Sequence, residues 1–332
     1  MKPTVHLVQL DCAWENKRAN HQRVHELLEE EPPPTGSLIV LPEMFSTGFS
    51  FNTAATSQHP GDREDDAFLS GLAMKHRCHV IGGVVSESSS GRCRNEAVVF
   101  DPEGREAARY AKRRPFNIGG EGAVHEAGRE IATFEWQGMK IAPLICYDLR
   151  FPELAREAVL DHGAEVLVYI ASWPSRRHQH WLTLLQARAI ENLAYVIGVN
   201  RAGQDPQFSY AGRTVAVDPH GVIIADAGAQ ERVMTLRIDP EAVRCWRKEF
   251  PALEDARRGI RKPSSVSAAR HKSKVPGLST GHFCKPADWF FQVSLPGSGK
   301  DVSDRRALVT ARERTVARGH HHLVNRQAQR GT

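Results

Sequence analysis

Short apolar runs alternate with amphipathic segments along the first 262 residues of the chain. Runs such as SLIVLPE and HVIGGVV are typical of strands buried inside a sheet. Residues 16–30 and 64–77 instead space their apolar positions as helices do. Because strands and helices alternate, the pattern predicts a layered α/β sandwich with helices on two faces. Further strands or hairpins are expected at residues 2–10, 97–110, 165–173, 194–201 and 214–228, and a further helix at residues 178–193.

One of the apolar runs ends at a cysteine. Residues 141–145 predict a buried strand, and Pro152 suits the first turn of a helix because its missing N–H is not needed there. Cys146 therefore lies where a strand turns into a helix. At such a turn the sulfur lies at the end of the sheet, beside backbone N–H groups that can bind an oxyanion. A lone cysteine is more often buried and inert, and this segment alone leaves that alternative open.

Two other predicted strands end in side chains that carry chemistry. The run SLIVLPE places Glu43 at the carboxyl end of a buried strand, where a carboxylate is costly unless it is hydrogen-bonded or protonated. Lys112 begins a polar loop at the end of the hairpin that turns near Gly104. We therefore expect Glu43, Lys112 and Cys146 to meet above one edge of a sheet.

From about Val5 to about Ala256 the chain resembles the nitrilase, or carbon–nitrogen hydrolase, superfamily. The resemblance is strongest to bacterial omega-amidases of the YafV type. It implies a four-layer α-β-β-α sandwich, a homodimer or higher homo-oligomer formed through helices, and a Glu-Lys-Cys triad in that chain order. The segments that carry the resemblance are LPEMFSTGF, the lysine loop, GGEGAVHEAG, LICYDLRFPELAR, ASWPSRRHQHW and LLQARAIENLAYVIGVNRAG.

In the chemistry that this resemblance implies, Cys146 attacks an amide carbon while Glu43 takes the thiol proton and later activates water. Lys112 and the backbone N–H of Tyr147 bind the oxyanion, a stabilisation of roughly 3–4 kcal/mol per donor. No metal or organic cofactor is required. Glu121, in GGEGAVHEAG, aligns with an acidic residue that many superfamily members place beside the lysine. A solvated loop glutamate is the alternative interpretation of this residue.

The loop after the strand at residues 165–173 supplies candidates for the substrate pocket. Trp173 either lines the pocket or is a packing aromatic residue. Arg176 and Arg177 could bind a substrate carboxylate through bidentate hydrogen bonds, although loop arginines are usually solvated. Asp148 and Arg150, which flank the strand-to-helix turn, are interpreted as its structural supports.

The lysine loop departs from the pattern of the most similar superfamily members. They commonly carry a histidine and a leucine shortly after the lysine, whereas this chain has Arg114 and Pro115. The departure leaves the triad intact. It leaves open the geometry of the loop and the fit of the substrate.

Charge divides the chain into two parts. The net charge is +5, yet residues 263–332 carry 12 Lys and Arg against 4 Asp and Glu, and residues 1–262 carry 32 against 35. Residues 263–332 lack an apolar period, so we expect a disordered, low-complexity basic tail after a carbon–nitrogen hydrolase domain at residues 1–262. Three consecutive histidines at residues 320–322 have no spaced partners and do not predict a metal site.

The six cysteines show no paired C-x-x-C spacing, which argues against a metal site and a disulfide framework. The first residues do not resemble a secretion signal, and no stretch approaches 18 apolar residues. These features predict a thiol-dependent enzyme of the cytoplasm that does not bind a membrane.

The resemblance predicts an amidase that hydrolyses the terminal amide of a small omega-amido 2-oxo acid, such as 2-oxoglutaramate or 2-oxosuccinamate. The products are the acid and ammonia, formed through a cysteine acyl-enzyme. Another carbon–nitrogen hydrolase of the same fold, acting on an N-carbamoyl compound, a deaminated peptide amide or a nitrile, is the alternative because the triad is shared. Binding of nucleic acid or an anionic surface through the basic tail is a remote alternative, because the tail lacks interleaved aromatic residues.

Overall fold

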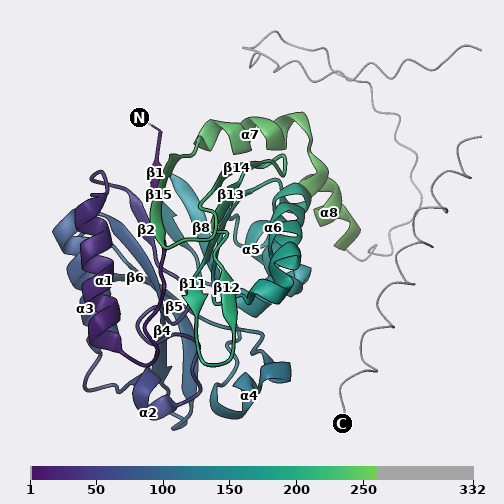
Figure 1. Cartoon of the computed structure of the whole chain (residues 1–332). Coiled ribbons are helices and arrows are strands. Elements are labelled where there is room, and N and C mark those ends of the chain that lie inside the picture. Colours follow the sequence, from purple (N-terminus) through teal and green to yellow (C-terminus); the bar gives the residue numbers. More distant parts are fainter. Residues whose placement is uncertain (1, 261–332) are drawn as a thin grey trace, which may run out of the picture. The chain divides into compact units, whose positions relative to one another are not determined.

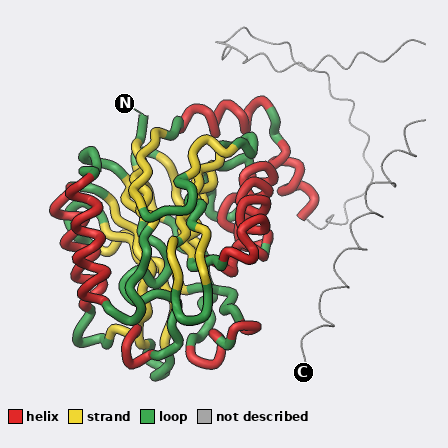
Figure 2. The backbone as a smooth tube through the Cα atoms, in the orientation of Figure 1, coloured by secondary structure: helices red, strands yellow, loops and turns green. Residues whose placement is uncertain are grey.

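The computed structural model describes residues 2–260. The predicted basic tail, with Cys284 and the histidines at residues 320–322, lies outside the described residues. Two β-sheets face each other in the described part, and helices cover their outer faces (Figures 1 and 2). The predicted four-layer α-β-β-α sandwich is therefore confirmed.

The first sheet carries helices α1 (Lys17–Glu30) and α3 (Glu64–His76) on its outer face. Its strand order is given by the pairing β15–β1–β2–β4–β5–β6, with β3 added beside β4. The strands are β1 (Thr4–Gln9), β2 (Leu38–Val40), β3 (Ser57–Gln58), β4 (His79–Glu87), β5 (Cys93–Phe100), β6 (Glu106–Ala111) and β15 (Arg232–Arg237).

The second sheet carries helices α5 (Pro152–Leu160) and α6 (His178–Asn192). Its strands pair in the order β14–β13–β10–β9–β8–β7. They are β7 (Phe134–Trp136), β8 (Met139–Ile145), β9 (Val166–Ala171), β10 (Tyr195–Asn200), β13 (Val215–Val217) and β14 (Ile223–Asp226). The remaining elements are the hairpin strands β11 (Ala202–Gln204) and β12 (Ser209–Ala211), the helices α2 (Thr53–Thr56), α4 (Glu121–Val124), α7 (Pro240–Glu249) and α8 (Ala252–Ile260), and the 3-10 turns η1 (Asn117–Gly119), η2 (Cys146–Arg150) and η3 (Ser175–Arg177).

Strand β2 shows why these short runs form the interior. Leu38 and Val40 point between the two sheets, whereas Ile39 points to the helices outside, and all three side chains are fully buried. A strand with both faces covered needs apolar residues at every position, so the run is continuous instead of alternating. This confirms the interpretation of SLIVLPE as a buried strand.

The two sheets repeat one pattern of strand pairing. Counted from β15 in the first sheet and from β7 in the second, successive pairs are antiparallel, parallel, parallel, antiparallel and antiparallel. By this count β2 in the first sheet is equivalent to β9 in the second, and β1 is equivalent to β8. The residues after β2, β6 and β9 gather at the same end of the sandwich, as the hydrogen bonds described below show, and Cys146, which follows β8, lines one pocket with Ser172 from the end of β9.

The predicted helices at residues 16–30, 64–77 and 178–193 correspond to α1, α3 and α6. Asn16 begins the first of them, because its side chain accepts a hydrogen bond from the backbone N–H of Ala19. Strand β15 and helices α7 and α8 are not predicted by the pattern. Within the described residues, no helix has both the length and the apolar character needed to cross a membrane.

Gly83 on β4 offers a test of how closely this strand packs, because it lies against the backbone that carries Glu43. A Cβ atom at residue 83 would lie 2.5 Å from the Cα of Glu43 and 2.6 Å from the backbone nitrogen of Met44. We expect Gly83→Ala to lower the free energy of unfolding by about 1–3 kcal/mol, as overpacking does. Urea denaturation would measure this change.

Gly71 on α3 provides the matched control. A Cβ atom there would meet nothing within 4 Å. Since alanine favours helix more than glycine does, Gly71→Ala should leave the free energy of unfolding unchanged or raise it by up to about 1 kcal/mol. Equal effects of the two substitutions would contradict the close packing of β4 against the Glu43 segment.

Candidate active site

One lysine lies between two buried carboxylates, close to strand ends of the first sheet. The Nζ of Lys112 lies 2.8 Å from Oε1 of Glu43 and 2.8 Å from Oε2 of Glu121. Asn95 on β5 closes a ring, because its Nδ2 donates to Oε1 of Glu43 at 2.7 Å and to Oε1 of Glu121 at 2.9 Å. Each of these four side chains is at most 1% exposed. Buried charges are tolerated when they are paired in this way.

The ring fixes the charges of Lys112 and Glu121. Burial alone lowers the pKa of Lys112, but the negative charges of Glu121 and Glu43 more than offset this and hold that pKa well above its ordinary value. Burial alone raises the pKa of Glu121, whereas the charge of Lys112 and hydrogen bonds from His125, Lys112 and the backbone of Phe116 bring it well below its ordinary value. Lys112 is therefore a fixed cation and Glu121 a fixed anion at neutral pH.

Glu43 also joins the two sheets. Its Oε2 accepts a hydrogen bond from the backbone N–H of Ser172 at 2.8 Å, and the hydroxyl of Ser172 donates to the backbone oxygen of Glu43 at 3.2 Å. Ser172 directly follows β9, and Glu43 follows β2, which is the equivalent strand in the other sheet. Three donors thus hold the Glu43 carboxylate, counting Lys112 and Asn95 on its other oxygen.

Cys146 occupies a turn of unusual backbone conformation. It directly follows β8 and has φ of 45°, in the left-handed region that residues other than glycine seldom adopt. Asp148 supports this turn, since its Oδ2 accepts from the N–H of Ile145 at 3.0 Å and from the hydroxyl of Tyr110 at 2.8 Å. Its Oδ1 accepts from the N–H of Arg114 at 2.9 Å. The interpretation of Asp148 as a structural support is confirmed.

The bond from Arg114 bears on the unusual lysine loop. Asp148 binds the backbone N–H of Arg114, a bond that does not depend on the side chain at this position, and the Arg114 side chain adds a contact to Glu153 at 3.3 Å. Burial raises the pKa of the Asp148 carboxyl to about 7, against the opposing effects of Lys112 and of its hydrogen-bond donors. Although Arg114 and Pro115 replace the histidine and leucine that are common in similar proteins, the loop keeps its hydrogen bond to Asp148 in the cysteine turn.

The thiol of Cys146 lies beside Glu43. Burial raises the pKa of Cys146 well above its ordinary value, and the charge of Glu43 and a hydrogen bond to it act in the same direction. Lys112 and the backbone N–H of Ser172 act in the opposite direction without prevailing. The resting group is therefore a thiol at neutral pH, with a carboxylate next to it that can accept its proton. Glu43 and Lys112 come from the first sheet and Cys146 from the second, so the expectation that all three lie above one sheet edge is wrong.

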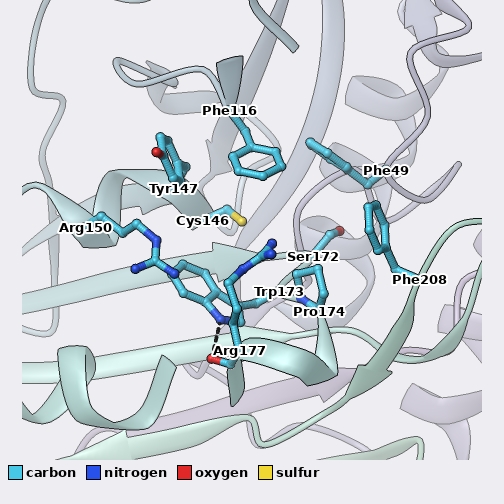
Figure 3. Close-up of a pocket in the computed structure, with 10 residues that line it drawn as sticks. All are labelled: Phe49, Phe116, Cys146, Tyr147, Arg150, Ser172, Trp173, Pro174, Arg177 and Phe208. Carbon is cyan, nitrogen blue, oxygen red and sulfur yellow. Dashed lines mark hydrogen bonds between the residues drawn. The ribbon is translucent and has the colours of Figure 1, made fainter. Parts of the chain in front are cut away.

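Cys146 opens into a pocket with aromatic walls (Figure 3). The structure places Tyr147, Trp173 and Arg177 in the lining, as the sequence suggested. It places Arg176 outside the lining, exposed, with its guanidinium 5.3 Å from the centre of the Phe208 ring. The lining residues are Phe49, Phe116, Cys146, Tyr147, Arg150, Ser172, Trp173, Pro174, Arg177 and Phe208.

Arg150 lines this pocket as well, although the sequence suggested only a supporting role for it. Its guanidinium lies 4.8 Å from the centre of the Trp173 ring, and that of Arg177 lies 5.5 Å from the centre of the Phe116 ring. Within residues 2–260 neither Arg150 nor Arg177 forms a salt bridge with a carboxylate. Burial, with the neighbouring charges of Arg176 and Arg150, lowers the pKa of Arg177. The arrangement suits an anionic ligand.

Sequence reasoning missed several residues of the site. Asn95 gave no clear signal, because it stands between Arg94 and Glu96 in the polar first half of the β5 sequence CRNEAVVF. Ser172 acts largely through its backbone, which gives no signal in the sequence. Phe49, Phe116 and Phe208 lie on loops whose approach to the pocket depends on the fold. In the described part of the chain, no group of three or more His, Cys, Asp or Glu side chains could hold a metal ion.

Comparison with known proteins gives consistent results. The family model for carbon-nitrogen hydrolases matches residues 4–248. A 2-oxoglutaramate amidase from Bacillus subtilis (strain 168) is 32% identical over 78% of this chain and its own whole length. Omega-amidase YafV from Escherichia coli (strain K12) is 38% identical over 75% of this chain and 95% of its own length. A crystal structure of a CN-hydrolase superfamily protein from Xanthomonas campestris, with an arsenic adduct in its active site, matches with a TM-score of 0.71 and 32% identity over 81% of this chain and 100% of that chain.

The raised pKa of the Cys146 thiol predicts how it reacts with iodoacetamide. The rate of alkylation at Cys146, followed by peptide mass spectrometry, should still rise with pH above about 9, where an ordinary thiol is already largely ionised. Glu43→Gln removes the neighbouring negative charge, so the pKa of the thiol should fall and the rate profile should shift to lower pH.

Glu103→Gln is the control, because Glu103 is an exposed carboxylate at the turn between β5 and β6. It should leave the alkylation profile of Cys146 unchanged. A wild-type profile with its midpoint at or below that of an ordinary thiol would contradict the protonated resting state.

Proposed function

This chain belongs to the carbon–nitrogen hydrolase family, and we propose that it is a thiol-dependent omega-amidase acting on small 2-oxo acids with a terminal amide. It is a hydrolase of carbon–nitrogen bonds other than peptide bonds. Relatives named 2-oxoglutaramate amidase and omega-amidase support the narrower activity. The observation that carries it is the pocket, where the thiol of Cys146 lies with the guanidinium groups of Arg150 and Arg177 (Figure 3).

In the proposed first half-reaction, the sulfur of Cys146 attacks the amide carbon while Glu43 accepts the thiol proton. A carbon–sulfur bond forms and the carbonyl electrons move to oxygen. Lys112 and the backbone N–H of Tyr147 stabilise that oxyanion. Their stabilisation of the negative charge is larger in a water-poor site than it would be in solution. Glu43 then passes its proton to the amide nitrogen, the carbon–nitrogen bond breaks, and ammonia leaves a thioester on Cys146.

In the proposed second half-reaction, water cleaves the thioester. Glu43 takes a proton from water as its oxygen attacks the thioester carbon, and the proton returns to the departing sulfur of Cys146. The free acid leaves and the resting enzyme is restored. Glu121 keeps Lys112 charged and in place throughout, which the 2.8 Å contact between them supports.

The two guanidinium groups account for the substrate class. A substrate whose carboxylate pairs with Arg150 or Arg177 has its other end in the same pocket as Cys146, because all three residues line it. Stacking against Trp173 and Phe116 holds the planar guanidinium groups in place. A nitrile or an uncharged amide would leave these cations without an anionic partner, although Arg150 also lies 3.1 Å from Nδ1 of His180, so the pocket favours a carboxylated substrate. An N-carbamoyl amino acid also has a carboxylate, and the names of the relatives favour the omega-amido acid over it.

We predict that ammonia release is fastest, by kcat/KM, with 2-oxoglutaramate or 2-oxosuccinamate in a panel that also holds glutamine, an N-carbamoyl amino acid and a simple nitrile. Cys146→Ala should abolish release from every member while its circular dichroism spectrum stays that of the wild type. A preference for the nitrile or the carbamoyl compound would overturn the omega-amidase assignment and leave the family membership standing.

Adding a neutral amide of matched length to the panel separates the roles of the arginines. A charge-assisted hydrogen bond is worth about 1.5–3 kcal/mol, so Arg150→Ala and Arg177→Ala should each reduce the preference for carboxylated over neutral amides by about 10- to 100-fold. Arg176→Ala should have a smaller effect. Arg237→Ala, on β15, is the matched control and should have none. Unchanged selectivity in both pocket variants would place the carboxylate elsewhere.

We also propose that the protein is a homodimer joined through the α6 side of the second sheet. Ile190 on α6, Val222 and Ile224 at β14 are 54%, 53% and 43% exposed. A Cβ atom at Gly221 would lie 2.4 Å from Ile190, so the turn that leads into β14 packs against this residue of α6, and exposed apolar side chains on both elements favour an interface there. Light scattering should give twice the chain mass, and Ile190→Glu should give the single-chain mass. Met74→Glu, at an exposed apolar residue on α3, is the control, and a wild-type monomer would contradict the proposal.

A cytoplasmic location stays a proposal. Its support is chemical, because a catalytic thiol has to remain reduced, and the cytoplasm keeps thiols in that state. Cys12, Cys78, Cys93 and Cys146 are free thiols in the described part of the chain. Cell fractionation would test the location, and recovery of the protein outside the cytoplasmic fraction would contradict it.

A further inference from the structure

A short hairpin closes one side of the pocket. Strands β11 and β12 pair with each other, and the backbone N–H of Asp205 donates to the oxygen of Phe208 at 2.9 Å across the turn between them. Phe208 is the residue of this turn that lines the pocket. Phe49 lines the same pocket, and in the view of Figure 3 Phe208 and Arg150 appear on different sides of Cys146. The hairpin therefore presents an aromatic ring to the thiol from an element outside both main sheets.

One buried carboxylate fixes the shape of this turn. Oδ1 of Asp205 accepts from the backbone N–H groups of Gln207 at 2.8 Å and Phe208 at 2.7 Å. Its Oδ2 accepts from the hydroxyl of Tyr210 at 2.5 Å, and its side chain is only 1% exposed. An aspartate that binds the backbone two and three residues further on holds a turn in one conformation. The position of the Phe208 backbone thus depends on Asp205.

Arg201 balances the charge of Asp205 and ties the hairpin to the rest of the fold. Its side chain is fully buried, with Nη1 3.9 Å from Oδ2 of Asp205 and the guanidinium 4.4 Å from the centre of the Tyr210 ring. Its Nη2 donates to the backbone oxygens of Cys12 and Gln204 at 3.1 and 3.2 Å. The arginine therefore joins the base of the hairpin to the segment that follows β1.

The hairpin also contacts the segments that supply other pocket residues. A Cβ atom at Gly48 would lie 2.9 Å from Nη1 of Arg201, so the loop that leads to Phe49 packs directly on the arginine. Tyr210 forms an isolated antiparallel bridge with Pro174, which lines the pocket. The hairpin is thus held from both neighbouring sides of the pocket.

We propose that Phe208 is a specificity-determining wall that restricts the pocket to short, unbranched acyl chains, and that Arg201, Asp205 and Tyr210 are positioning residues that hold the wall. None of these three side chains lines the pocket, so they act through Phe208. A ring fixed in the lining of this pocket leaves space for a compact chain and excludes added methylene groups. The identity of the substrate rests on the proposed omega-amidase function, whereas the wall itself rests on the geometry alone.

The first experiment tests the proposed role of Phe208 without any substrate. Rates of alkylation at Cys146 are measured with iodoacetamide and with the bulkier iodoacetanilide, using peptide mass spectrometry to identify the residue. The wild type should strongly prefer the small reagent, and Phe208→Ala should reduce that preference at least about tenfold, the lower end of what one methylene group contributes in a fitted pocket. Phe208→Leu should restore part of the preference. An unchanged ratio in Phe208→Ala would overturn the wall.

The second experiment uses omega-amido 2-oxo acids lengthened by one and two methylene groups. The kcat/KM of the wild type should fall by about 10- to 200-fold per added group, and Phe208→Ala should flatten this decline. Absence of turnover with every member would overturn the proposed function, while the alkylation ratio would still report on the wall. The two failures are therefore distinguishable.

The positioning network is tested by Tyr210→Phe, which removes the hydroxyl that binds Asp205. It should shift both readouts in the direction of Phe208→Ala by a smaller amount, and raise KM for the shortest substrate while kcat stays near the wild-type value. Gln207→Ala, at an exposed side chain of the same turn, should change neither readout. Wild-type selectivity in Tyr210→Phe, or a loss of kcat without a change of KM, would overturn the positioning role.

Discussion

A single buried cation between two buried carboxylates controls the chemistry of this site. Glu43 and Glu121 both contact Lys112, and a thiolate at Cys146 would add a further negative charge in a region where charges interact strongly. This explains why burial and Glu43 keep the thiol protonated. A proton that moves from sulfur to Glu43 leaves the number of negative charges around Lys112 unchanged. The transfer therefore avoids the cost of creating a new buried charge.

The fold supplies this arrangement by bringing equivalent strand ends of two sheets together. Glu43 follows β2 and Ser172 follows β9, and two hydrogen bonds join the two residues across the sandwich. The absence of a side chain at Gly83 lets β4 approach the backbone of Glu43 closely. The carboxylate is consequently held by groups from both sheets, so its position relative to Cys146 is a property of the whole sandwich and not of one loop.

Local patterns in the sequence predicted those parts of the site that depend on local structure. Buried strands that end in Glu43 and Cys146 are visible in single runs of residues, as is the helix that begins at Pro152. That Glu43 and Lys112 come from one sheet and Cys146 from the other depends on pairings between distant segments, such as β1 with β15, which no run of neighbouring residues encodes. Asn95 was missed for a similar reason, because its amide becomes important only when Glu43 and Glu121 are both within its reach.

Arg150 shows why the reaction is easier to predict than the substrate. The ring around Lys112 is built from strand ends, and a change of one member leaves a buried charge without a partner, so few alternatives are tolerated. The pocket instead is formed by the turns η2 and η3 and by the β11–β12 hairpin, where side chains such as Arg150 and Phe208 face a space instead of a packed core. Replacing a residue there changes which molecule fits without unfolding the protein. A protein can therefore share its chemistry with relatives at 32–38% identity while, as we propose for this chain, the rim of its own pocket selects the acyl chain.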